Sequence, residues 1–291
     1  MTPQNQKLGV AIMALTTLVF ASQDGFSRHL AGAYNVFLVV MIRYWFFAAF
    51  VILLALRRPG EMQRMLRPRY PVLQILRGVL LVLEIDITIQ SFVFLGLVDA
   101  QAIFISYPLM IAALSVPVLG ERFGWRRWAA IGVGFLGVLI ILRPGFGVFS
   151  PYALMPLAGA FAFAIYGVMT RYVARGDDAA VSFFWTGIAG AVTATLIGIW
   201  HWQPMTGSDW IWMTVLSLLG ILGHGMMIRA YELAEASSLQ PIAYLQLVFS
   251  AAVGMIVFGD VLHLNVAVGA ALTSGAGLFT IWRARMQMKH G

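Results

Sequence analysis

The 291-residue sequence contains no cysteine and few charged residues. Without thiols, the chain can form neither disulfide bonds nor thiolate metal sites. Charged residues make up 11% and hydrophobic residues 60% of the chain, against roughly 25% and 45–50% in a typical soluble domain. This composition predicts an integral membrane protein, and no polar segment is long enough for a soluble domain.

The sequence also lacks the usual signs of a metal or cofactor site. The five histidines are scattered without ligand spacing, so we expect no metal. The segment Gly132–Gly137 matches G-x-G-x-x-G but lies inside an apolar helix, without the preceding strand that a dinucleotide site needs. A G-x-x-x-x-G-K-[ST] motif is absent, which argues against ATP hydrolysis. We therefore predict no cofactor.

What the chain has in abundance is long apolar runs. About 20 consecutive apolar residues are needed for one helix to cross the bilayer core. Runs of roughly that length predict ten transmembrane helices, at about residues 8–28, 35–56, 72–96, 100–119, 125–142, 152–171, 180–200, 209–229, 238–258 and 264–282. The expected fold class is thus an all-α integral membrane protein in direct contact with the lipid bilayer.

The positive charges are distributed asymmetrically between the two sides of these helices. Sixteen of the 19 lysine and arginine residues fall in the loops on one side, together with both termini. This is the positive-inside pattern, which places the N and C termini in the cytoplasm. The net charge of +7 therefore reflects topology rather than nucleic-acid binding.

The chain contains an internal repeat. An offset of 139 residues aligns residues 91–121 with residues 230–260 without a gap, and in both copies a long apolar helix ends at a glycine followed by an acid. Two halves of five helices are implied, at residues 1–145 and 146–291. Because five is an odd number, the second half enters the membrane from the opposite side, so the repeats are inverted. Inverted repeats are typical of alternating-access transporters.

These features resemble the drug/metabolite transporter superfamily, in its ten-helix branch with two EamA-type repeats. The resemblance rests on the 5+5 layout, the Gly120-Glu121 and Gly259-Asp260 turns, the glycine-rich fifth and tenth helices, and Arg43. Within that branch the chain looks most like the YddG-type aromatic amino-acid exporters. The resemblance implies a bacterial inner-membrane exporter with a central cavity lined by helices 1–4 and 6–9. Pro108 and Pro117 depart from the repeat, because they align with Leu247 and Ile256.

Polar residues inside the apolar helices are the candidate site. Glu84, Asp86 and Gln90 lie within the third helix, where ionisable side chains mark pathways or buried pairs. We expect Arg43 to pair with one of the two carboxylates, leaving the other for a proton or a substrate ammonium, with a slight preference for Asp86. A purely structural cluster bridged by Arg43 remains an alternative. Asp24 is expected to pair with Arg28 four residues later.

Each of the remaining candidate site residues also has a purely structural interpretation. Gln23 and His224 can bind substrate or can hydrogen-bond a neighbouring helix. Ser106 and Tyr107 precede Pro108, whose missing N–H frees a carbonyl that is tolerated only beside protein or a cavity. Tyr166 and Tyr244 can stack on an aromatic substrate or can cap an apolar wall.

Two classes of function fit these observations. The first is a secondary transporter that exports amino acids, chiefly aromatic and other neutral ones. The second is a membrane-embedded enzyme acting on a lipid or small metabolite, but no nucleophile or metal cluster near an interface favours it. The sequence does not indicate the oligomeric state.

The inverted repeat makes a testable prediction about topology. A reporter fused after Gly176 should be cytoplasmic, and one fused after Gln203 should be periplasmic, because an odd number of helices precedes the second half. Alkaline phosphatase and fluorescent-protein fusions at each site measure this. The opposite location at either site would contradict the inverted arrangement.

Overall fold

The computed structural model describes residues 3–57, 59–120, 124–142, 151–234, 239 and 242–288, and these residues form helices and connecting turns without a β-strand. The α-helices, apart from two short 3-10 turns, are α1 (Pro3–Ala33), α2 (Val36–Leu56), α3 (Glu61–Met65), α4 (Pro71–Leu95), α5 (Leu97–Phe104), α6 (Tyr107–Leu119), α7 (Trp125–Leu142), α8 (Leu154–Val173), α9 (Ala179–Gly198), α10 (Gly207–Leu233), α12 (Leu245–Phe258) and α13 (Leu264–Met288).

Each predicted apolar run coincides with one of these helices or with the α5–α6 pair. Among the described residues, seven spans are long and apolar enough to cross a membrane, and three shorter apolar helices lie in α7, α12 and α13. The all-helical membrane fold is therefore confirmed, whereas the count of ten spanning helices stays a prediction. In the region of the ninth predicted helix, residues 239, 242 and 243 are helical, and α12 continues from Leu245 to Phe258.

The fourth predicted helix, expected as one run over residues 100–119, is instead divided into α5 and α6 just before Pro108. Phe104 ends α5, and Pro108 lies in the first turn of α6, where the missing N–H costs no hydrogen bond. The aligned helix α12 starts at the equivalent point. Gly120 and Gly259, which lie 139 residues apart, both end their helices in the left-handed region, with φ of 75° and 68°. Glu121 and the boundary between the proposed halves lie outside the described residues.

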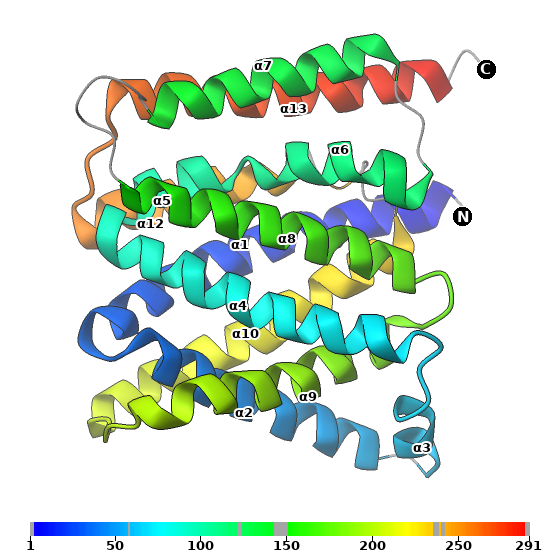
Figure 1. Cartoon of the computed structure of the whole chain (residues 1–291), viewed down its shortest axis with the longest axis vertical. Helices are drawn as coiled ribbons and strands as arrows, with labels where there is room; N and C mark the ends of the chain where they lie inside the picture. The colour runs from blue at the N-terminus through cyan, green and yellow to red at the C-terminus, as the bar shows by residue number, and fades with distance from the viewer. Residues whose placement is uncertain are drawn as a thin grey trace.

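The helices form stacked layers in which early and late segments alternate. Helix α1 packs on α10, α2 on α9, α4 on α8, and α7 on α13. Figure 1 shows α7 and α13 as a separate pair at one edge of the stack, and α1 begins at the same end of the molecule at which α13 ends. The arrangement leaves the other helices to enclose the polar residues.

Glycines permit the closest of these contacts. A Cβ atom at Gly137 would lie 2.6 Å from the carbonyl oxygen of Gly269, so α7 and α13 touch backbone to backbone. A Cβ atom at Gly132, five residues earlier on α7, would meet nothing within 4 Å. The G-x-G-x-x-G segment is thus a helix-packing element.

Gly137→Val should destabilise the protein, whereas Gly132→Val should be nearly neutral. The added side chain at position 137 must push α7 away from α13, and overpacking of this kind costs roughly 1–3 kcal/mol. Thermal unfolding of both variants in detergent measures the difference. Equal melting temperatures would contradict the close approach of the two helices.

Candidate functional site

A small polar cavity of about 40 Å³ lies among α1, α2, α4, α5, α8, α10 and α12. This volume is close to the share of one water molecule in the liquid, about 30 Å³, so an organic solute requires the helices to move apart. Both halves of the chain contribute to the wall. The lining residues are Phe20, Gln23, Asp24, Arg43, Glu84, Ile85, Thr88, Ile89, Phe92, Gln101, Phe104, Phe163, His224 and Gln246.

Asp24 of α1 is held by neutral donors. Its Oδ2 atom accepts hydrogen bonds from the side-chain amide of Gln101, from Nε2 of Gln246 at 3.1 Å and from Oγ of Ser250 at 3.3 Å. The predicted pair with Arg28 is wrong. Sequence reasoning also missed the three donors, although Gln101 and Gln246 interrupt apolar helices in the same way as Glu84 does.

Arg28 instead pairs with Asp260, 232 positions away. Its Nη1 atom lies 2.6 Å from Oδ2 of Asp260, and its guanidinium lies 4.3 Å from the ring centroid of Phe258. The same carboxylate accepts from the backbone amides of Leu97 at 2.8 Å and Val98 at 3.2 Å, at the start of α5. Partial burial acts to raise the pKa of Asp260, but these hydrogen bonds outweigh it and leave the pKa below its ordinary value.

Arg43 of α2 forms no ion pair within 4 Å among the described residues, so the expected bridge to the third helix is also wrong. Its Nη2 atom lies 3.2 Å from Nε2 of His224 on α10, which implies a ring proton on Nδ1. Nη1 has no hydrogen-bond partner in the part of the chain that the structure describes. Gly220 makes room for the guanidinium, since a Cβ atom there would lie 2.8 Å from Nε. The arginine thus presents a free donor beside the cavity.

The polar residues of α4 divide between the cavity and the surrounding protein. Glu84 lines the cavity, and its Oε1 accepts from Thr88 at 2.8 Å. Asp86 is buried, with one oxygen unpartnered, but it does not line this cavity. Gln90 is half-buried and also lies outside it. The geometry therefore favours Glu84 over the slightly preferred Asp86.

The remaining candidates lie around the cavity rather than on its wall. Tyr107 packs against Phe104 and Phe163, with ring centroids 5.2 and 4.8 Å apart. The hydroxyl of Tyr166 lies 3.4 Å from Arg77. Tyr244 fills the space left by Gly277 on α13. Ser106 is fully buried and its hydroxyl has no partner. By contrast, Gln23 and His224 do line the cavity.

These features define a multi-pass α-helical membrane protein with a polar cavity between its helices. The chain belongs to the EamA-like transporter family, whose sequence model matches residues 7–143 and 150–282. It is therefore a membrane transporter, not the membrane-embedded enzyme considered as the alternative. The resemblance to the drug/metabolite transporter superfamily is confirmed at this level.

The chain is similar to named transporters from several bacteria. An S-adenosylmethionine uptake transporter of Rickettsia felis is 26% identical over 284 residues, covering 97% of this chain and 96% of that protein. A riboflavin transporter of Brucella anthropi is 28% identical, covering 82% of this chain and 87% of that protein. A crystal structure with 20% identity superposes with a TM-score of 0.69 over 98% of this chain and 99% of its own, which supports the fold alone.

These relatives do not support the finer resemblance to aromatic amino-acid exporters. Their names specify uptake of S-adenosylmethionine and transport of riboflavin. At such distances a shared fold carries different substrates, because substrate choice depends on a few cavity side chains. The cytoplasmic location of the termini stays a prediction.

Replacing Gln101 by leucine should destabilise the protein by about 1.5–3 kcal/mol, because the buried Asp24 carboxyl group loses a donor. Gln90→Leu is the matched control, since Gln90 is half-buried on α4 and lies outside the cavity. Thermal melting of both variants in the same detergent measures the effect. If both substitutions lowered the melting temperature equally, the hydrogen bond to Asp24 would not be important for stability.

Proposed function

We propose that this chain is a secondary transporter for an organic metabolite that carries a positive charge, an amino-acid group and an aromatic ring. S-adenosylmethionine is the first candidate. The observation that carries the proposal is the excess of acid over base at the cavity. Asp24 and Glu84 line it, Asp86 is buried nearby, and among the described residues Arg43 is the one arginine or lysine on its wall.

A buried carboxylate without a cation is costly in a membrane interior. Neutral donors hold Asp24, and a hydroxyl holds Glu84. A cationic solute would supply the missing charge when it enters the site. The sulfonium and ammonium groups of S-adenosylmethionine both have this property, whereas riboflavin is neutral.

The other parts of such a solute also find counterparts on the wall. Nη1 of Arg43 is free to donate to a carboxylate. Oε1 of Gln23 and Oε1 of Gln101 are buried acceptors without partners, suited to amino groups. Phe20, Phe104 and Phe163 line the cavity and can pack on an aromatic ring, each for about 0.5–1.5 kcal/mol.

Transport by alternating access requires a barrier at each end of the cavity. At one end, Asp260 joins α1 to the start of α5 through Arg28 and Leu97. At the other end, Asp177 accepts from the backbone amide of Arg69 at 2.6 Å and from Gln74 at 3.0 Å, which joins α4 to the α8–α9 turn. We propose that these two contact sets open in turn, driven by solute or ion gradients rather than by ATP.

Export of an aromatic or other neutral amino acid is the second candidate. It is favoured by the same aromatic wall and by the pairing of an arginine donor with acidic acceptors, which suits the two ends of any zwitterion. A free amino acid lacks the additional sulfonium charge, so it compensates the acidic excess less completely. The direction of transport separates the two candidates as well, since the Rickettsia felis relative is named for uptake.

Proteoliposomes that hold the purified protein should take up labelled S-adenosylmethionine, with weaker competition by tryptophan and none by riboflavin. Asp24→Asn should weaken apparent substrate affinity roughly tenfold to hundredfold, since a charge-assisted contact is worth about 1.5–3 kcal/mol. Asp209→Asn is the matched control, because Asp209 is a half-buried carboxylate at the start of α10 that does not line the cavity.

Transport of riboflavin with no competition by S-adenosylmethionine would contradict the cationic substrate. Tryptophan transport without S-adenosylmethionine transport would favour the second candidate. If Asp24→Asn and the control were equally active, Asp24 would not contact the solute.

A further inference from the structure

A second cavity lies at the outer side of the helix stack, and its lining residues differ from those of the polar site. It has a volume of about 400 Å³ and lies between α2, α3 and α9. Most of its wall is apolar, and its lining residues are Val51, Leu54, Ala55, Arg57, Glu61, Arg64, Met65, Ala180, Phe183 and Phe184. Helices α2 and α9 both belong to spans long and apolar enough to cross a membrane.

The short helix α3 forms one side of this groove and is fixed in place. Arg64 forms ion pairs with Glu61 and with Asp178 at the start of α9. The indole N–H of Trp185 on α9 donates to the carbonyl oxygen of Met65 at 2.9 Å. Through these contacts, the charges of Glu61 and Arg64 are balanced by other side chains of the protein. The groove is therefore a built feature of the fold.

Arg57 is the charged residue of the groove that takes no part in these contacts. It follows α2 directly, its side chain is exposed, and no carboxylate of the described chain lies within 4 Å of it. The segment from residue 57 to residue 77 contains six arginines and one acid, Glu61. A large apolar groove with an unneutralised basic rim is complementary to an acyl chain that ends in an anionic head group.

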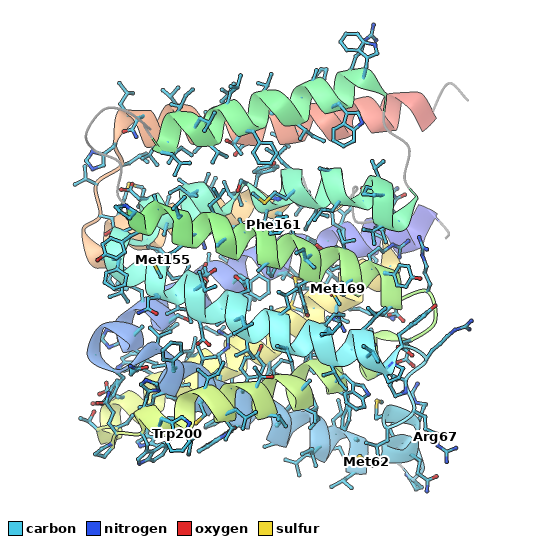
Figure 2. The ribbon with its side chains drawn as sticks, in the orientation of Figure 1. Met62, Arg67, Met155, Phe161, Met169 and Trp200 are labelled. Atoms are coloured by element: carbon cyan, nitrogen blue, oxygen red, sulfur yellow. The ribbon has the colours of Figure 1, made fainter. Side chains whose placement is uncertain are left out.

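The opposite end of the α2–α9 pair lacks this chemistry. There Trp45 and Trp202 stack with ring centroids 6.1 Å apart, and Trp45 donates to Thr195 at 2.8 Å. The chain contains no lysine or arginine between residues 176 and 228. Figure 2 shows Met62 and Arg67 at the α3 end and Trp200 at the other. The charge asymmetry restricts an anionic ligand to the α3 end.

We propose that the groove between α2, α3 and α9 binds an anionic phospholipid, with an acyl chain against Val51, Leu54 and Phe183 and the phosphate at Arg57. By the predicted topology this lipid belongs to the cytoplasmic leaflet. It would join α2 to α9, which come from different halves of the chain. The proposal does not depend on the identity of the transported solute.

The test compares phosphatidylglycerol with phosphatidylcholine on the purified, delipidated full chain. Native mass spectrometry measures lipid occupancy, and thermal melting measures stabilisation. We expect phosphatidylglycerol to bind more tightly and to raise the melting temperature more. Arg57→Gln should weaken its apparent affinity about fivefold, as expected for the loss of one arginine near a lipid surface.

Two matched controls make the groove itself testable. Arg67→Gln removes an exposed arginine of the same segment that does not line the groove, and it should keep tight binding. Ala180→Trp should fill the groove and abolish the preference for phosphatidylglycerol, whereas Val192→Trp, at an exposed position on the same helix, should not.

Four results would overturn the proposal. Equal occupancy by the two lipids would remove the requirement for an anionic head group. An equal loss in Arg57→Gln and Arg67→Gln, or full binding by Ala180→Trp, would indicate diffuse attraction rather than this groove. If inorganic phosphate produced the same rise in melting temperature as phosphatidylglycerol, the site would be an anion site without a lipid chain.

Discussion

The hydrogen bonding of Asp24 is the constraint on which the polar site depends. A buried carboxylate is usually paired with an arginine, but here two glutamine amides and a serine hydroxyl donate the hydrogen bonds instead. These donors come from α5 and α12, which pack on each other and both contact α1. Because neutral donors satisfy the oxygen without cancelling its charge, the cavity keeps an acidic character that a solute can complete.

Neither Arg28 nor Arg43 forms an ion pair with the carboxylates of this site. Arg28 closes one end of the helix stack with Asp260, and Arg43 faces His224. Both of these arginine contacts have a structural consequence. The Arg28 pair ties the end of α1 to the turn between α12 and α13, and the Arg43 contact leaves one N–H beside the cavity. In the proposed transport cycle, this separation of charges supplies both a removable barrier and an unoccupied binding group.

The sequence predicted the elements well and the partners poorly. Apolar length locates the helices, and the glycines at 120 and 259 locate matching helix ends, whereas the division of residues 100–119 into α5 and α6 was not predicted. Helical spacing also suggested that Asp24 pairs with Arg28, four residues on. That inference failed because tertiary contacts outweigh the few tenths of a kcal/mol of such a local pair. Asp260 lies 232 residues from Arg28, and a single sequence carries no measure of that proximity.

The two inferred sites also differ in what holds their ligands, and this follows from their depth. In the interior, water is excluded and each unpaired donor or acceptor is costly, so a solute can be selected by matching individual atoms such as Arg43 Nη1 and Gln101 Oε1. At the α3 end, Arg57 is exposed and its charge is partly screened, so selectivity there has to come from the combination of charge with the apolar groove. Substitutions in the cavity should therefore change substrate choice, whereas substitutions in the groove should change how firmly α2 and α9 are held together in a given membrane.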